Sequence, residues 1–233
     1  MARKEGDEDE ASPVLVSWSG GKDCALALRE IVATSSPKKK ILGLITTITF
    51  DFQRVSMHGV RRSLIQAQAA SLGLPLEEVF IPRNAPNAVY EERFAKGVSK
   101  YGAQSIVFGD LFLADVRGYR EAFLRSRLGV GAEFPLWGRD TAELARKFVE
   151  LGFGAIVCTV DQRKLGREYC GREFDRSFIE DLPQGVDPCG ENGEFHTFAY
   201  RGPIFSREIS VARGDVVLRD GFYFCDLILG NRS

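Results

Sequence analysis

The most informative segment of this 233-residue chain is Val14-Leu-Val-Ser-Trp-Ser-Gly-Gly-Lys-Asp-Cys24. Its apolar start predicts a buried strand, and the pattern from Asp23 to Ala33 predicts a helix. Between the two, Gly20 and Gly21 let the backbone approach a ligand, and the first N–H groups of the helix point at the same place. A glycine pair alone would favour an ordinary turn, but with Lys22 as a mobile positive charge the stretch predicts a polyphosphate site.

Strand and helix signals alternate along the first part of the chain, and this alternation predicts an α/β fold with a doubly wound parallel sheet. Asn87 suits the N-cap of one helix, and Gly102 suits its C-terminal stop. In such a sheet, ligands bind beyond the carboxyl ends of the strands, which is where the glycine loop would lie. Strands are expected over residues 14–18, 41–50, 74–81 and 106–109, and helices over 23–33, 59–72 and 88–101.

The pattern changes near Trp137 and predicts a smaller C-terminal α+β domain. A helix over 141–151 and a strand over 155–160 are expected, and β segments over 209–211 and 216–229 finish the chain. The expected organisation is an acidic, disordered tail at residues 1–12, a nucleotide-binding domain at 13–136 and a substrate domain at 137–230.

Composition and charge exclude several classes of protein. Lys plus Arg total 31 and Asp plus Glu total 32, so no overall field attracts nucleic acid or a membrane surface. The sequence has no apolar run as long as a membrane span, and its charged start lacks the apolar segment of a signal peptide, so we expect a cytoplasmic protein. Five cysteines without a Cys-x-x-Cys pair indicate free thiols, and a zinc site from Cys158, Cys170, Cys189 and His196 is disfavoured.

The glycine loop lacks the Gly-x-Gly-x-x-Gly spacing of dinucleotide-binding proteins and the Gly-x-x-x-x-Gly-Lys-Ser/Thr of a P-loop, which disfavours a dehydrogenase or a simple kinase. Ser19-Gly-Gly-Lys-Asp23 instead resembles the PP-loop of the ATP pyrophosphatases, the adenine nucleotide alpha hydrolase superfamily with its HUP-like fold. This resemblance implies that ATP is cleaved between its α and β phosphates and that AMP is transferred to a substrate. ATP and Mg²⁺ are then the expected cofactors.

Five further motifs are His58-Gly-Val-Arg61, Gln66-Ala-Gln68, Leu72-Gly-Leu-Pro75, Phe108-Gly-Asp110 and Asp187-Pro-Cys-Gly-Glu-Asn-Gly-Glu-Phe-His-Thr197. Together they resemble the diphthine-ammonia ligase family in its short prokaryotic form, over residues 14–229. The resemblance implies that ATP and ammonium convert diphthine, a modified histidine on elongation factor 2, into diphthamide. Cys24 departs from the Ser or Thr that this family carries at the end of the loop, and a thiol is a weak hydrogen-bond donor.

The nucleotide site is expected at the loop and at the ends of the neighbouring strands. Lys22 is the expected catalytic cation, and Asp23 either orients Mg²⁺ through water or caps the helix that follows. His58 and Arg61 are expected one turn apart on one face at the start of a helix, where they would meet a phosphate or a substrate carboxylate. The alternative for Arg117 is a solvated helix face. The nucleotide-binding candidates are Ser17, Ser19, Gly20, Gly21, Lys22, Asp23, Cys24, Thr46, His58, Arg61, Gly109, Asp110 and Arg117.

The last of the five motifs supplies the remaining catalytic candidates, Glu191, Glu194 and His196, beside Lys22 and Asp23. Its glycines predict a tight turn that presents both glutamates to one point, where they would hold ammonium or deprotonate it. The alternative is an exposed loop that ends in a strand, with the neighbouring phenylalanines in the core.

Two other functions share the same loop. Cys24 and Cys189 hint at sulfur transfer to tRNA, but the sequence shows neither the paired cysteines nor the basic extension of the thiolating relatives. A non-catalytic nucleotide-binding module would need the loop but not the late acidic motif. We therefore expect an ATP-dependent ligase whose acceptor is elongation factor 2 or another carboxylate-bearing molecule. A homodimer is compatible with the sequence.

Overall fold

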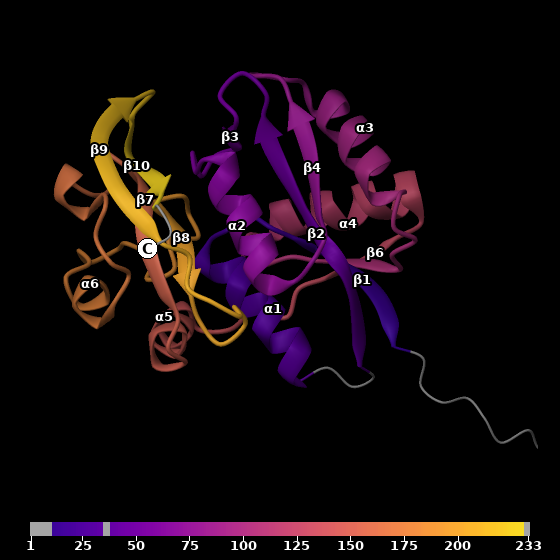
Figure 1. The fold of residues 1–233 in the computed structure, drawn as a ribbon, viewed down its shortest axis with the longest axis horizontal. Coiled ribbons are helices and arrows are strands. Elements are labelled where there is room, and N and C mark those ends of the chain that lie inside the picture. Colours follow the sequence, from indigo (N-terminus) through magenta and orange to yellow (C-terminus); the bar gives the residue numbers. More distant parts are fainter. Residues whose placement is uncertain (1–10, 35–37, 231–233) are drawn as a thin grey trace, which may run out of the picture.

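The computed structural model describes residues 11–34 and 38–230, and in these the chain forms two sheets that lie side by side (Figure 1). Within this part of the chain, the first sheet has six strands in the order β3-β2-β1-β5-β6, with β4 also paired to β2. The pairings are parallel except that of β3, which runs antiparallel to the end of β2. The strands are β1 (Ser12–Ser17), β2 (Lys39–Thr49), β3 (Arg54–Val55), β4 (Leu76–Ile81), β5 (Ser105–Val107) and β6 (Gly131–Glu133).

Helices cover both faces of the first sheet. Val14 and Val16 belong to the buried cluster that includes residues of α1 and α2, whereas Leu15 belongs to the cluster on the opposite face with residues of α3 and α4. A strand that is buried on both faces is typical of a parallel sheet between helices. The predicted doubly wound α/β fold is therefore confirmed. The helices are α1 (Lys22–Thr34), α2 (Arg62–Leu72), α3 (Asn87–Val98) and α4 (Ala114–Leu128).

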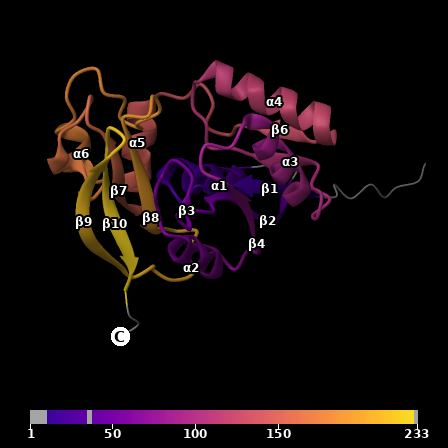
Figure 2. The same ribbon diagram turned by 90° about the horizontal axis from the view of Figure 1, so that it is seen from above.

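The second sheet is smaller and antiparallel, in the order β8-β7-β10-β9, and the helices of this unit lie beside it (Figure 2). The single β segment expected over residues 216–229 is wrong, because the chain reverses at Asp220 and Gly221 to form a hairpin. Both residues have positive φ angles, 50° and 86°, which a tight hairpin turn requires. The elements are α5 (Thr141–Glu150), β7 (Gly154–Asp161), η1 (Arg167–Tyr169), α6 (Arg176–Glu180), β8 (Phe195–Arg201), β9 (Val211–Arg219) and β10 (Phe222–Leu229).

The two sheets are joined through the glycine loop. The N–H of Ala199 on β8 donates to the carbonyl of Gly20 at 2.8 Å, and the Gln68 side chain on α2 donates to the carbonyls of both residues. Gln68 in turn accepts a 2.8 Å hydrogen bond from the indole N–H of Trp18. One buried apolar cluster contains residues of both units, including Val16 and Phe198. The domain boundary expected near residue 137 stays a prediction.

Several element ends differ from the sequence prediction. The second helix begins at Arg62 and not at residue 59, because Arg61 is held in an extended conformation by a bridge to Arg54. Asn87 is the first residue of α3, and Pro86 is its N-cap. The helix ends at Val98, before Gly102.

Residues 1–10 of the acidic tail expected at residues 1–12 lie outside the described residues. Ser12 already belongs to β1, where it pairs with Lys39. No helix within residues 11–34 and 38–230 is long and apolar enough to cross a membrane.

Candidate active site

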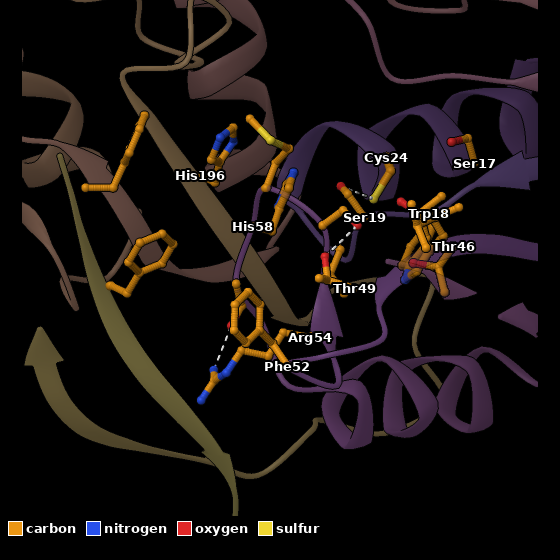
Figure 3. Close-up of a pocket in the computed structure, with 18 of the residues that line it drawn as sticks. Ser17, Trp18, Ser19, Cys24, Thr46, Thr49, Phe52, Arg54, His58 and His196 are labelled. Carbon is orange, nitrogen blue, oxygen red and sulfur yellow. Dashed lines mark hydrogen bonds between the residues drawn. The ribbon is translucent and has the colours of Figure 1, made fainter. Parts of the chain in front are cut away.

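A pocket of about 1630 Å³ opens at the carboxyl ends of β1, β2 and β5 and continues toward the β9–β10 hairpin. Figure 3 shows part of its wall, where Ser19, Cys24, Thr46 and His58 come from the first unit and His196 from β8. We call the part nearest the glycine loop the inner end. It is lined by Ser17, Ser19, Lys22, Asp23, Cys24, Thr46, His58, Gly109, Asp110, Glu191, His196 and Thr197.

Close backbone approach at the inner end requires glycine at two of the predicted positions. Gly20 has a φ of 82°, and a Cβ there would lie 2.5 Å from the side chain of Ile65 and 2.8 Å from that of Gln68. A Cβ on Gly109 would lie 2.8 Å from backbone atoms of Asp23 and Cys24. The end of β5 therefore rests directly against the first turn of α1 and fixes the shape of the loop.

Lys22 is fixed rather than mobile, and in this respect the sequence prediction is wrong. The residue is 3% exposed, and its Nζ donates to Asp23 Oδ2 at 2.8 Å and to the carbonyl of Cys189. The ammonium group also lies 5.4 Å from the centre of the Phe195 ring. Burial alone would lower the pKa of Lys22, but the neighbouring acidic groups, Asp23 first and then Cys189 and Glu191, together outweigh this effect and raise it. The side chain thus carries a permanent charge in the wall of the pocket.

The late motif folds over the loop. Thr197 Oγ1 accepts a 3.0 Å hydrogen bond from the Lys22 N–H, and Glu191 Oε1 accepts a 2.7 Å hydrogen bond from the N–H of Leu111. Glu191 therefore faces the pocket beside Asp23 and Asp110. Burial, followed by the charges of these two carboxylates, raises the pKa of Glu191 to about 7.

Glu194 does not reach the pocket. Its side chain is 2% exposed, and its Oε1 accepts hydrogen bonds from the N–H of Asp187 and from the amide of Asn192. The predicted tight turn is present, since Gly190 and Gly193 have φ angles of 69° and 81°. Because one carboxylate holds this turn together from the inside, the two glutamates do not meet at one point.

His58 and His196 lie together, with ring centroids 4.4 Å apart and 26° between the ring planes (Figure 3). Burial and the charge of Lys22 lower the pKa of His196 to about 4, and burial together with His196 lowers the pKa of His58 well below its ordinary value. Both rings are therefore neutral at neutral pH. The expected placement of His58 in a first helical turn is wrong, because it lies in the loop that precedes α2.

Arg61 and Arg117 do not line the pocket. Arg61 pairs with Asp226 on β10 at 2.7 Å, and Arg117 pairs with Glu121 one turn along α4. These carboxylates hold the two guanidinium groups outside the site. The cation that sequence reasoning missed is Arg120, which lines the pocket, lies 3.0 Å from Asp110 Oδ2 and is one turn from Arg117 on the same helix.

The thiol of Cys24 turns back onto the loop and donates to the carbonyl of Gly21 at 3.1 Å. Burial raises its pKa to about 11, so it stays protonated at neutral pH. A reactive thiolate is thus not part of this site.

The pocket fits a nucleotide. Four buried polar atoms on its wall have no hydrogen-bond partner among the residues that the structure describes. Asp110 Oδ2 and Arg120 Nε form an ion pair with each other, whereas Thr46 Oγ1 and His58 Nδ1 lack a partner of either kind. A polar ligand in the pocket would supply the missing hydrogen-bond partners of these atoms. Within residues 11–34 and 38–230, no group of three His, Cys, Asp or Glu side chains could hold a metal ion. Mg²⁺ would therefore bind here together with the nucleotide, held by one or two carboxylates and by the phosphates.

The fold and the site together define an α/β nucleotide-binding enzyme in which a C-terminal motif closes over a glycine loop. Residues 12–130 match the family described as diphthamide synthase N-terminal domain, and residues 140–227 match the diphthamide synthase C-terminal domain. The chain therefore belongs to the diphthamide synthase family.

Individual relatives agree with this assignment. A diphthine--ammonia ligase from Homo sapiens is 25% identical over 233 residues, covering 88% of this chain and 85% of the relative. A diphthine--ammonia ligase from Bos taurus is 26% identical over 226 residues, covering 85% and 82%. One from Danio rerio is 29% identical over 138 residues, covering 56% and 49%. The prediction of an enzyme of the ATP-dependent ligase class is confirmed.

Proposed function

We propose that the chain amidates a carboxylate with ammonium at the expense of ATP, releasing AMP and pyrophosphate, and that the acceptor is diphthine on elongation factor 2. The observation that carries this proposal is the closure of the late motif over the glycine loop. Lys22 is bonded to Cys189 and Thr197, and Glu191 faces the same pocket. A cation for phosphates and a titratable carboxylate are thus held side by side.

Amide formation needs an activated carboxyl group, because a carboxylate is a poor electrophile. Transfer of AMP to the carboxylate makes an anhydride that an amine can attack, with pyrophosphate as the leaving group. The fixed ammonium of Lys22 and the N-terminal end of α1 supply preorganised positive charge for that leaving group. Asp23 and Asp110 are the carboxylates that would hold Mg²⁺ beside the phosphates.

In this proposal Glu191 binds and deprotonates the nitrogen donor. Once deprotonated, its carboxylate can accept hydrogen bonds from ammonium, which carries four N–H donors. A pKa of about 7 allows Glu191 to accept a proton from ammonium near neutral pH. In this scheme Glu194 keeps a structural role in the turn, and His58 and His196 remain neutral hydrogen-bonding partners.

The products of ATP turnover test the proposal. Purified protein is incubated with MgATP, ammonium and elongation factor 2 that carries diphthine, and the nucleotides and the acceptor are analysed by chromatography and mass spectrometry. AMP with pyrophosphate and an amidated acceptor are expected. ADP would indicate phosphoryl transfer, and unchanged ATP would indicate a nucleotide-binding module.

A lysine variant tests the role of the loop. Lys22→Ala removes the fixed cation and should lower the rate of pyrophosphate release by about a hundredfold or more. The matched control is Lys100→Ala, which removes an exposed lysine that pairs with Glu77 far from the pocket. Circular dichroism and thermal unfolding report whether the variant still folds. A folded Lys22→Ala protein with normal turnover would remove Lys22 from the mechanism.

Thiol chemistry has no support from the site. The cysteines at residues 24, 158, 170, 189 and 225 are all buried, and burial raises the pKa of each. The cytoplasmic location and a homodimer stay predictions.

A further inference from the structure

The pocket continues well beyond the inner end. At about 1630 Å³ it is larger than the roughly 300–1000 Å³ of ordinary small-ligand sites. Its far part, which we call the outer groove, runs between two walls. One wall carries Phe52 and Met57, and the other is the face of the β9–β10 hairpin that carries Asp215, Val217, Arg219 and Phe222. Figure 3 labels Phe52, Arg54 and His58 on the first wall, from the outer groove toward the inner end.

The hairpin presents one face to the outer groove because side chains alternate along a strand. Val217 and Arg219 line the groove, whereas Leu218 between them does not. Arg219 lies opposite Phe222 in the ladder and Val217 opposite Phe224, and both phenylalanines also line the groove. One face of the two-stranded β9–β10 hairpin therefore forms this wall of the groove and leads toward the inner end.

Apolar side chains stay exposed on both walls. Phe52 is 51% exposed, Met57 76% and Val217 37%, and all three line the groove. A small polar substrate would leave such side chains in water, whereas a polypeptide segment lying between the walls would cover them. Exposed apolar groups gathered in a groove are typical of a protein interaction site.

The charges of the groove argue against a polyanion. Asp51, Asp215, Asp220 and Asp226 are nearly balanced by Arg54, Arg83 and Arg219. A groove for RNA would instead carry an excess of positive charge. Arg54 pairs with Asp226 and Arg83 with Asp220, but no ion pair is present for Arg219 in the part of the chain that the structure describes. Arg219 is thus available to an acidic side chain of a partner.

The backbone along the groove is strained at Met57. Met57, Asn84 and Asp220 have φ angles of 68°, 55° and 50°, and all three line the pocket. Asparagine and aspartate often adopt this conformation in turns, but for an unbranched apolar residue such as methionine it is unfavourable. Strained backbone gathers at ligand-binding edges that the rest of the fold holds in shape.

We propose that the outer groove docks a polypeptide segment of the acceptor protein, the segment that carries the carboxylate to be amidated. The segment lies between residues 52–57 and the hairpin, its apolar side chains cover Phe52, Met57 and Val217, and an acidic side chain meets Arg219. The inference rests on the proposed function, since the groove leads into the pocket where the carboxylate would be activated.

Two variants and a matched control test the docking surface. Val217→Asp and Met57→Asp place a charge on opposite walls, and aspartate tolerates the backbone conformation of residue 57. Leu218→Asp is the control, because Leu218 is the next residue on the same strand, is 52% exposed and does not line the pocket. Each protein is assayed for AMP formation against the concentration of acceptor protein, and for binding of an ATP analogue by calorimetry.

Both groove variants should raise KM for the acceptor protein by about tenfold or more, with kcat and nucleotide affinity unchanged. Leu218→Asp should behave like the wild type. Equal KM values for Val217→Asp and Leu218→Asp would overturn the inference, as would a loss of nucleotide affinity in Val217→Asp. A wild-type dimer that Val217→Asp dissociates, seen by light scattering, would assign the groove to a second copy, and binding of tRNA that Val217→Asp abolishes would assign it to nucleic acid.

Direct binding separates this inference from the proposed function. Calorimetry of the acceptor protein without ATP should show binding to the wild type and to Leu218→Asp but weaker binding to Val217→Asp. If the wild type binds the acceptor in this way but forms no AMP, the proposed reaction fails while the docking surface stands. If AMP forms and the groove variants bind the acceptor as tightly as the wild type does, the inferred docking surface is wrong while the proposed reaction stands.

Discussion

The two ends of the pocket are built in opposite ways. At the inner end Lys22 is 3% exposed and hydrogen-bonded to Asp23 and Cys189, and Gly109 has no room for a Cβ beside the backbone of Asp23 and Cys24. In the outer groove Met57 and Val217 are exposed, and the Arg83–Asp220 ion pair spans 3.6 Å between exposed side chains. One end is thus shaped by the fold and tolerates little change, while the other is a surface whose residues contribute mainly to binding.

The largest effect is expected at the packing that joins the inner end to the second sheet. Phe198 on β8 is fully buried and packs against Gly20. Phe198→Ala should lower the free energy of unfolding by about 3–5 kcal/mol, because it leaves a cavity between the sheets. Urea denaturation measures the loss, and Phe50→Ala, at a residue 61% exposed, is the control. Similar losses in both variants would mean that the inner end is not tightly packed.

A second large effect is expected in the pH dependence of the reaction. As a base, Glu191 must be deprotonated, so the rate of amide formation should rise as the pH passes about 7. Glu191→Gln should reduce the rate by about a hundredfold at pH 8 and remove this rise. The pH profile of the variant is compared with that of the wild type, because the concentration of free ammonia also increases with pH. Glu121→Gln is the surface control.

The same glutamate gives a stability test with a defined sign. A carboxyl group with a raised pKa contributes stability at low pH that is lost as the pH rises through about 7. Glu191→Gln should therefore gain stability relative to the wild type between pH 5 and pH 8, measured as the difference in urea midpoint. If the difference in urea midpoint between Glu191→Gln and the wild type is the same at pH 5 and pH 8, the pKa of Glu191 lies near its ordinary value.

A smaller effect is expected at Gly109. A methyl group there would press on the backbone of Asp23 and Cys24, so Gly109→Ala should cost about 1–3 kcal/mol of stability and weaken nucleotide binding by about tenfold. Gly118→Ala is the control, because its Cβ would meet nothing within 4 Å and helix propensity favours it. If both variants bind the nucleotide equally well, the contact between β5 and the loop does not shape the site.

The smallest effect is expected at the mouth of the outer groove. Asp220→Asn removes an ion pair between exposed side chains, keeps a residue that tolerates the φ of 50°, and should change the free energy of unfolding by less than about 0.5 kcal/mol. Urea denaturation at low and high salt measures it. A loss comparable with that of Phe198→Ala would show that the outer groove is as rigid as the inner end.

The fold was predictable because its signals are local. The glycine loop, the alternating strands and helices, and the parallel sheet all follow from runs of neighbouring residues. The sequence pattern does not separate the two strands of the hairpin although Asp220-Gly221 is a typical turn pair, because apolar residues continue on both sides of that pair.

The site was harder to predict because charged groups find partners far away in the sequence. Helical spacing could place Arg61 and Arg117 on helices, but it could not show that Asp226, 165 residues later, holds Arg61 outside the pocket. Likewise, the turn between Gly190 and Gly193 was visible in the sequence, but the burial of Glu194 depends on which side of the turn faces the core. Sequence patterns give the position of a side chain along an element, and only the tertiary fold gives its partner.

The hydrogen bonds from β8 to the loop also have a consequence for synthesis. Gly20 and Lys22 leave the ribosome long before their partners Ala199 and Thr197, and the Lys22–Thr197 hydrogen bond joins residues 175 positions apart. The loop can therefore adopt its final shape only after β8 has been synthesised. A nascent or truncated chain would be expected to carry the signature residues of an ATP site without being able to use the nucleotide.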